Sequence, residues 1–293
     1  YSLSNTSELS KDEDGIVIIK TASFAGVGGL QQVFAGVGFK VLDNLSIGAN
    51  ISYIYGDITH SVTTAFSNSS SFSSVRLDKI SINDYKLDFG LQYSYKFNKK
   101  HVLNFGAVYS LGHSVNGKGY KYNQKWLNGA DYPSTQTGDT ITNAFSLPHT
   151  FGAGLTYVYD NRLTIGADFT YQQWEDAKFY NEKSYFSNRT KLAAGAEFVP
   201  NPFSRNYLKR VRYRVGGYYS DPYTKVDGQD GTREYGVSAG FGFPLFQSKS
   251  ILNISGQYVR VSPKVKGMLE ENYLKINIGL TFNERWFMKW KVD

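Results

Sequence analysis

Hydrophobic and small or polar residues alternate strictly in two adjacent runs of this chain, residues 151–159 and 163–172. In the first run Phe151, Leu155 and Tyr157 share one face, while glycine and threonine fall on the other. Side chains of a β-strand alternate between two faces, so each run predicts a strand with one hydrophobic face. The Asp160-Asn161 pair between the runs predicts a tight turn. A tilted strand of roughly 9–11 residues is long enough to cross a bilayer.

The same pattern recurs and predicts about twelve strands. Their expected spans are 15–24, 30–41, 45–58, 84–97, 101–113, 147–159, 162–174, 189–198, 209–219, 233–243, 250–261 and 271–282. Short connections rich in Asn, Asp, Pro or Lys alternate with long ones at about 59–83, 114–146, 175–188, 220–232 and 262–270. We therefore predict an all-β fold, a transmembrane antiparallel up-and-down β-barrel of about 12 strands (range 10–14), with short periplasmic turns and long extracellular loops.

We expect residues 1–293 to form a single outer-membrane β-barrel domain. Residues 1–14 are expected to be an N-terminal periplasmic segment, and residues 283–293 a C-terminal periplasmic tail. The chain starts at Tyr1 without a signal peptide, so a mature or truncated product is expected and its export signal is assumed.

Aromatic residues support a membrane barrel rather than a large soluble β-sandwich, whose strands also alternate. On the hydrophobic face, aromatic rings gather at both ends of the strands, with aliphatic residues such as Ile47, Leu91 and Ile165 between them. Rings at the two membrane interfaces give this pattern, whereas a sandwich gives no reason for it. The expected girdle at the short-turn end contains Phe39, Tyr95, Phe97, Tyr157, Tyr159, Phe198, Phe243 and Phe282, and that at the long-loop end contains Tyr53, Tyr55, Tyr109, Phe169, Tyr171, Tyr219 and Tyr258.

Composition narrows the function classes. The chain has no cysteine, which removes thiolate chemistry and fits a location outside the cytoplasm, here the bacterial cell outer membrane. The net charge of +7 is spread without a long basic run, so we predict no nucleic-acid binding. Four histidines, His60, His101, His113 and His149, lack metal-ligand spacing. We therefore predict no metal site, no cofactor and no enzymatic activity.

The second face of the predicted strands is polar and is expected to line the lumen. Its candidate lumen-facing residues are Asp88, Lys96, Asp168, Glu197, Arg212, Arg214 and Lys275. Charges at mid-strand are costly against lipid and should point inward. Two interpretations stay open: a lumen that conducts or binds solute, and a set of cross-strand ion pairs that fills and rigidifies the barrel.

Two segments carry a family resemblance. The segments are GGLQQVFAGVGFKVLDNLSIGANISYIYGD (28–57) and NYLKINIGLTFNERWFMKWKVD (272–293). They resemble the FadL-type outer-membrane transport family, especially its Bacteroidetes members, and the resemblance covers residues 15–293. Asn277, Gly279 and Phe282 also fit a polar-x-Gly-x-x-aromatic signal for barrel assembly. The resemblance implies up to fourteen strands, uptake of hydrophobic molecules such as long-chain fatty acids, an N-terminal hatch, and a kinked strand that opens the wall sideways.

The chain departs from that family at its start, where no hatch-like segment precedes residue 15. The Gly-rich stretch with Gly26, Gly28 and Gly29 is the candidate wall bend, with a simple tight loop as the alternative. Phe34 and Trp174 are candidate ligand-binding residues. The expected partners are outer-membrane lipid, a hydrophobic small-molecule ligand or detergent, and other outer-membrane or periplasmic proteins. Two alternatives stay open, a docking barrel in an outer-membrane secretion or assembly complex and a surface adhesin.

Overall fold

The computed structural model describes residues 2–11, 17–68, 71–127, 135–180, 183, 185–226, 228–245, 250–264 and 270–282. The predicted C-terminal tail, residues 283–293, lies outside these ranges. No helix in the described part of the chain is both long and apolar enough to span a membrane.

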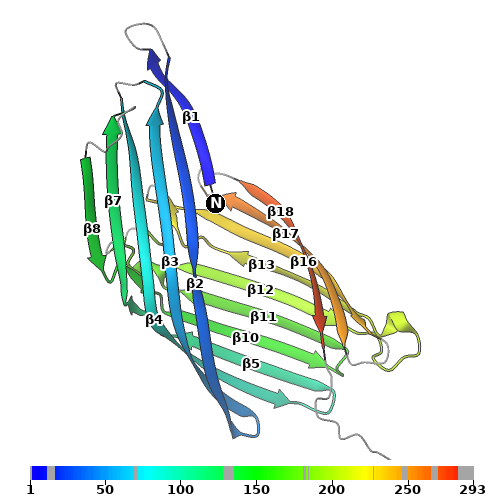
Figure 1. The fold of residues 1–293 in the computed structure, drawn as a ribbon. Coiled ribbons are helices and arrows are strands. Elements are labelled where there is room, and N and C mark those ends of the chain that lie inside the picture. The colour runs from blue at the N-terminus through cyan, green and yellow to red at the C-terminus, as the bar shows by residue number, and fades with distance from the viewer. Residues whose placement is uncertain are drawn as a thin grey trace, which may run out of the picture.

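The strands form one antiparallel path in which each strand pairs with the next (Figure 1). The order is β1 (Ser2–Lys11), β2 (Val17–Leu42), β3 (Leu45–Phe66), β4 (Phe72–Lys96), β5 (His101–Ser110), β10 (Thr150–Tyr159), β11 (Leu163–Gln172), β12 (Arg189–Phe198), β13 (Arg212–Ser220), β16 (Thr232–Pro244), β17 (Ile251–Pro263) and β18 (Glu271–Thr281). This path confirms the all-β, up-and-down antiparallel fold and the prediction of about twelve strands.

Additional short elements join the connections. The strands β7 (Gly117–Leu127) and β8 (Thr135–Thr142) extend the sheet beside the first half of β4. The other short strands are β6 (His113–Val115) with β9 (Phe145–Leu147), and β14 (Lys225–Val226) with β15 (Gln229–Asp230). Within the described ranges the 3-10 helices are η1 (Trp174–Asp176) and η2 (Tyr207–Lys209).

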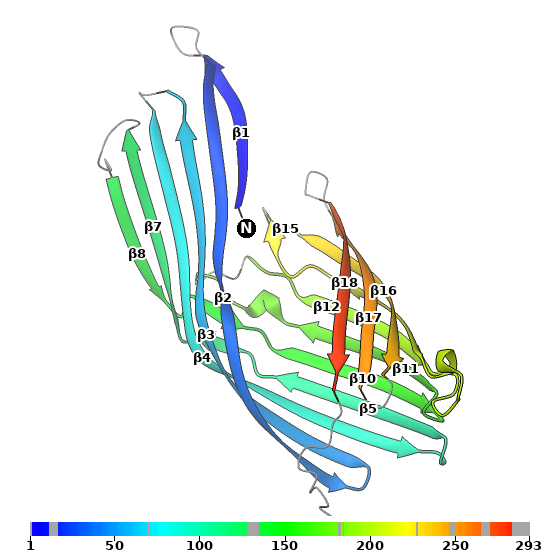
Figure 2. The same cartoon turned by 45° about the vertical axis from the view of Figure 1, so that its right-hand side comes forward.

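The strands of the sheet differ in length, so its two sides rise to different heights. Strands β2, β3 and β4 contain 26, 22 and 25 residues, and with β1, β7 and β8 they form what we call the tall wall. Strands β5, β10, β11, β12 and β13 contain 9 or 10 residues each and form the short wall. Figures 1 and 2 show the tall wall extending well beyond the short one at the long-loop end.

Several predicted boundaries were wrong in the tall wall. Residues 59–66 and 72–82, expected within a loop, continue β3 and β4, and much of 114–146 forms β7 and β8. The two strands expected at 15–24 and 30–41 are one continuous β2, and residues 2–11, placed before the first strand, form β1. Where the sheet projects beyond the bilayer its outer face meets water, and hydrophobic residues such as Ile80 and Ile82 are buried only on the inner face, so the alternation is too short to identify these strands.

The hairpin that opened the sequence analysis has the expected geometry. Asp160 and Asn161 have φ of 50° and 51°, and the Arg162 amide donates to the Tyr159 carbonyl at 2.9 Å. Two consecutive left-handed residues define a type I′ turn, whose twist matches that of antiparallel strands. The register that follows places Leu155 opposite Ala167 on β11 and opposite Phe105 on β5. The hydrophobic face is therefore continuous across three strands.

A cluster of buried hydrophobic residues lies on one face of the tall wall. Ile54, Ile80 and Ile82 pack with Val115, Ala144 and Tyr180 from the long connections. Because connecting segments cover this face, we call it the inner face; Figure 2 shows them on the concave side of the sheet. Side-chain alternation then assigns every second residue of each paired strand to the inner face and the rest to the outer face.

Candidate functional site

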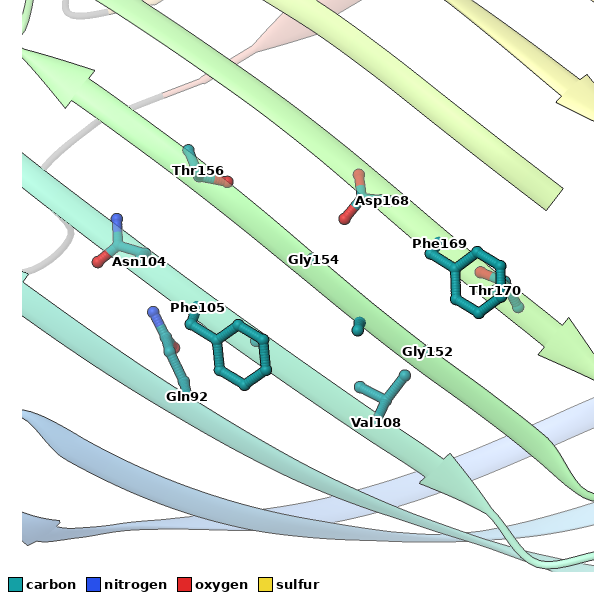
Figure 3. A pocket seen from close by; sticks show the side chains of 12 residues that line it. Gln92, Asn104, Phe105, Val108, Gly152, Gly154, Thr156, Asp168, Phe169 and Thr170 are labelled. Atoms are coloured by element: carbon teal, nitrogen blue, oxygen red, sulfur yellow. The ribbon is translucent and has the colours of Figure 1, made fainter.

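The inner face of the short wall is hollow and polar (Figure 3). Glycines at its centre leave a hollow of about 370 Å³. The hollow is lined by Gln92, Asn104, Phe105, Gly106, Val108, Gly152, Ala153, Gly154, Thr156, Asp168, Phe169 and Thr170. Asp168 projects beside Gly154, where an added Cβ would stand 2.3 Å from its Oδ1. The predicted inward position of Asp168 therefore depends on a glycine on the neighbouring strand.

An ion-pair network crosses the inner face at the short-turn end. Glu197 of β12 accepts from Arg212 Nη1 at 2.8 Å and from Arg214 Nε at 2.6 Å. Arg214 also donates to Asn253 Oδ1 on β17 at 2.7 Å, and the Asn253 amide donates to Thr281 on β18 at 3.2 Å. The structure thus joins three of the predicted residues and links strands from β12 to β18.

The other predicted lumen residues lie on the same face but apart from this network. Asp88 accepts hydrogen bonds from Lys86 and from Ser110 of β5. Lys96 lies opposite Val102 at the short-turn end of the same strand face. Lys275 of β18 lies over the Tyr273 ring, with its Nζ 4.9 Å from the ring centroid. The charges are therefore distributed around the wall rather than gathered at one centre.

Aromatic side chains from the long connections gather over the inner face at the long-loop end. We call them the mouth cluster, and its members are Phe145, Trp174, Phe179, Tyr180, Phe186 and Tyr223. Trp174 lies at its centre, with ring centroids 5.2 Å from both Phe186 and Tyr223. Burial, and then the nearby Asp78 carboxylate, raise the pKa of Tyr180 to about 12, so this ring stays neutral at physiological pH.

An irregularity in the wall lies beside the buried isoleucines. Gly28 (φ 102°) and Gly56 (φ 142°) lie on adjacent strands, two register steps apart: Gly28 lies opposite Ile58, and Gly56 lies opposite Leu30. A Cβ on Gly28 would stand 2.0 Å from the Asp57 carbonyl oxygen, and one on Gly56 would stand 2.3 Å from that of Gly29. Both positions therefore require glycine. Gly26 and Gly29 lie in the same continuous strand, so there is no tight loop at this bend.

The candidate ligand-binding residues lie on different elements. Trp174 lies in the mouth cluster, as just described. Phe34 lies on β2 opposite Ser52, on the inner face, and 70% of its surface is exposed. Ser52 itself is buried and accepts a hydrogen bond from Gln32 at 2.7 Å. The structure does not bring Phe34 and Trp174 into one pocket among the described residues.

The outer face carries two apolar hollows. One has a volume of about 620 Å³ between β2, β3, β4, β5 and β10, and the other about 510 Å³ between β5 and β13. Their lining includes Phe39, Ile47, Leu91, Phe105 and Leu192, which the alternation pattern assigned to the outer face. These hollows are wide and shallow surfaces suited to lipid chains, unlike the polar inner hollow.

Several site residues could not be found by sequence reasoning. Gly56 needs the pairing register, because it acts on a residue of another strand. Asn253 falls on the polar face by alternation, but its bond to Arg214 also needs the register. The mouth cluster draws on residues from 145 to 223, and its only sequence signal is the aromatic content of the stretch 174–186. No group of three or more His, Cys, Asp or Glu residues in the described part of the chain could hold a metal ion.

A family model named BamG matches residues 1–293, the whole chain, and the chain therefore belongs to the BamG family. A search of curated proteins finds no match.

Solved structures of FadL-type proteins have a similar fold. The chain superposes on the toluene transporter TodX of Pseudomonas putida with a TM-score of 0.55 and 15% identity, covering 95% of this chain and 76% of that one. It superposes on the toluene transporter TbuX of Ralstonia pickettii with a TM-score of 0.53 and 11% identity, covering 91% and 78%. For a FadL homologue of Pseudomonas aeruginosa the values are 0.53, 16%, 84% and 67%. At these identities the likeness shows a FadL-like fold. Two of these three structures, those of TodX and TbuX, are described as toluene transporters.

Proposed function

We propose that this chain forms the wall of a bacterial outer-membrane barrel that captures hydrophobic small molecules at its long-loop end. The observation that carries the proposal is the position of the mouth cluster, an aromatic and aliphatic patch over an otherwise polar inner face. Aromatic surfaces of this kind bind apolar ligands through area and ring stacking. The FadL-like fold supports the class of protein, and the hydrocarbon-channel relatives support an apolar ligand.

The contrast between the apolar mouth cluster and the polar inner face below it also suggests a route for the ligand. Below the mouth cluster, the inner face carries the Glu197 ion pairs and the Asp88 hydrogen bonds. An apolar molecule placed there would remove water from these polar groups without forming hydrogen bonds to them, so this part of the face does not favour its binding. Beside the cluster, the Gly28–Gly56 irregularity adjoins Ile54 and Ile80. We propose that ligand leaves sideways at this bend, into the outer leaflet, and does not cross the polar floor. Phe34 would contact ligand that moves down β2.

Uptake into liposomes tests this proposal. Proteoliposomes should take up a fluorescently labelled long-chain fatty acid several-fold faster than empty liposomes, and unlabelled toluene should compete if the ligand is a monoaromatic hydrocarbon. Trp174→Ala should remove most of the gain, because it takes away the central ring of the mouth cluster. Trp126→Ala is the matched control, since Trp126 lies on β7 opposite Ser73 and outside the cluster. Equal uptake by protein-containing and empty liposomes would refute the transport function.

A second candidate is a docking barrel that holds partner proteins in an outer-membrane secretion or assembly complex. The observation that favours it is the upper part of the tall wall, where Ser, Thr and charged residues such as the Asp57–Lys79 pair (3.1 Å) dominate. The edge strand β8 (TQTGDTIT) is likewise polar and exposed. Purification in mild detergent discriminates the two: a stable stoichiometric complex with no uptake activity would favour docking, and an active isolated barrel would favour transport.

A further inference from the structure

The outer face carries neighbouring tyrosine rings at the long-loop end of β13 and β16. Tyr219 of β13 lies directly opposite Tyr235 of β16, and their ring centroids are 5.2 Å apart. The next strand continues this row, because Tyr258 of β17 lies opposite Val237, the outer-face residue that follows Tyr235 on β16. Tyrosine rings on the lipid-facing side of a barrel lie at the level of the lipid head groups. These rings therefore mark the upper limit of the hydrocarbon on this side of the barrel.

Two arginines lie above these rings on the same face. Arg233 is the next outer-face residue of β16 beyond Tyr235, and Arg260 is the next one of β17 beyond Tyr258. Arg233 lies opposite Ser262, so it is a diagonal neighbour of Arg260. Diagonal neighbours are about 7–8 Å apart, within reach of long side chains. The two arginine side chains are 42% and 54% exposed, so one anion at the level of the head groups can contact both guanidinium groups.

The Arg233 guanidinium has unused hydrogen-bond donors. Its partner in the wall is Asp221, but Arg233 Nε lies 3.8 Å from Asp221 Oδ1, which is too far for a hydrogen bond. The same carboxylate oxygen accepts instead from the Tyr219 hydroxyl at 2.6 Å. Arg233 Nε is buried and has no hydrogen-bond partner among the described residues. A buried donor without an acceptor is costly, and a phosphate is the acceptor that matches the planar guanidinium best.

Arg260 is paired but keeps donors as well. Its Nε and Nη2 lie 2.9 Å and 2.6 Å from Oε1 of Glu270, so one carboxylate oxygen takes both contacts and other N–H groups of Arg260 stay available. Asp221 and Glu270 balance the charges of the two arginines. The attraction of this site for a phosphate therefore depends on directed hydrogen bonds more than on net charge.

An apolar hollow lies directly below this pair of arginines. It is the outer-face hollow of about 510 Å³, whose lining includes the small residues Ala167, Ala194 and Gly217 and, nearest the long loops, Tyr219. Gly217 lies opposite Val237, four residues along β16 from Arg233. Four strand residues span about 14 Å, so the hollow and the arginines lie one above the other within the length of a lipid molecule. A lipid offers the matching pair of groups, a phosphate at one end and an acyl chain at the other.

We propose that Arg233 and Arg260 bind the phosphate of a phosphorylated glycolipid of the outer leaflet, and that one of its acyl chains lies in the hollow below Tyr219. The long loops of the barrel are extracellular, so the two arginines lie at the surface of the outer leaflet. In a bacterial outer membrane that leaflet contains lipid A, the phosphorylated glycolipid anchor of lipopolysaccharide. The proposal rests on the outer-membrane location of the barrel and not on its uptake of hydrophobic molecules, so binding of this lipid and uptake can fail separately.

Native mass spectrometry with purified lipid A tests the phosphate half of the site. The folded protein, freed of lipid in detergent, should bind lipid A, and Arg233→Gln combined with Arg260→Gln should weaken this binding about ten-fold, because it removes charge-assisted hydrogen bonds. Lipid A without its phosphates should bind the natural chain as weakly. Lys79→Gln combined with Lys118→Gln is the matched control, since it removes two charges from the outer face of the tall wall and should leave binding unchanged.

A second pair of variants tests the acyl-chain half. Ala194→Leu fills the hollow and should weaken lipid A binding several-fold, whereas Ala239→Leu lies on the outer face outside the hollow and should not. Phosphatidylglycerol and inorganic phosphate serve as competitors and should displace lipid A poorly. Unchanged binding by the arginine variant, equal binding of lipid A without phosphates, or equal effects of the two leucine variants would overturn the proposal. Displacement by phosphatidylglycerol at equal concentration would overturn the assignment to a glycolipid, and displacement by inorganic phosphate would overturn the role of the hollow.

Discussion

The two parts of strand β4 show how one strand meets two environments. In its lower part Leu87, Phe89 and Leu91 lie on the outer face, in register with Ile51, Ala49 and Ile47 of β3. In its upper part the same outer face carries Val75, Leu77 and Lys79, paired with Thr63, Ser61 and Thr59. Pairing with β3 is uninterrupted between these parts, whereas the strand on the other side changes from β7, beside residues 72–82, to β5, beside residues 88–96. The outer-face side chains change as well, and that change places the edge of the membrane near Tyr85 on the tall wall.

The largest effect is expected where the two parts of the tall wall meet. Gly56→Val forces a side chain into the Gly29 carbonyl at a left-handed φ, and should destabilise the barrel by about 3 kcal/mol or more. Urea unfolding of the reconstituted protein, followed by heat-modifiable gel mobility, measures the change. Gly29→Ala is the control, because an added Cβ there meets nothing within 4 Å. Similar losses for both variants would show that the Gly28–Gly56 geometry is not what matters.

The same substitution in the lower and upper parts of β4 tests whether the two parts meet different environments. Leu91→Arg puts a charge on the outer face in the apolar zone and should cost about 2–4 kcal/mol, whereas Leu77→Arg lies above it and should cost about 0–1 kcal/mol. Unfolding free energies of the two variants in the same lipid give the answer. A large cost at Leu77 would extend the membrane-facing zone into the tall wall and move its boundary.

The ion pairs of the short wall should have a smaller effect. Glu197→Gln leaves Arg212 and Arg214 without their carboxylate partner, but the three side chains are 25–41% exposed, so the expected loss of stability is about 1 kcal/mol. A double-mutant cycle with Arg214→Met isolates the pair. A coupling free energy near zero would mean that these charges line the lumen without stabilising the wall.

The smallest effect concerns the connections above the short wall. Asp230 accepts hydrogen bonds from Lys264 and Ser187, both at 2.7 Å, and these bonds hold the pKa of its carboxyl below the ordinary value of 3.8. A lowered folded-state pKa stabilises the protein above pH 3.8, and this stabilisation is lost as the pH falls through the folded-state pKa. Asp230→Asn should therefore be slightly less stable than the natural chain at pH 7 and equally stable at low pH. A difference that persists in acid would point to packing instead of charge.

The strands of the short wall could be predicted from the sequence, whereas the strand segments above the membrane could not, for one physical reason. Lipid on one side and a lumen on the other impose a two-residue period, so the strands around Leu155 and Ile165 could be predicted with their turn and their faces. Above the membrane the outer face meets water and only a few inner-face residues such as Ile80 and Ile82 are buried, so the strands from Thr59 to Ile82 could not be told from a loop. The charged pair of Glu197 and Arg214 could be placed on one face, but its link to Asn253 needed the register. The mouth cluster joins side chains far apart in sequence, for which no local pattern exists.

Spin-label accessibility along β4 tests the central claim most directly, because the cysteine-free chain allows one label at a time. Labels at residues 85–93 and at residues 74–79 would be compared in lipid bilayers for collision with oxygen and with a water-soluble nickel chelate. The account predicts a two-residue period in the lower part, with odd-numbered positions favouring oxygen, and no preference for oxygen at either parity in the upper part. A period that continues unchanged into residues 74–79, or an oxygen preference at the even-numbered lower positions, would contradict it.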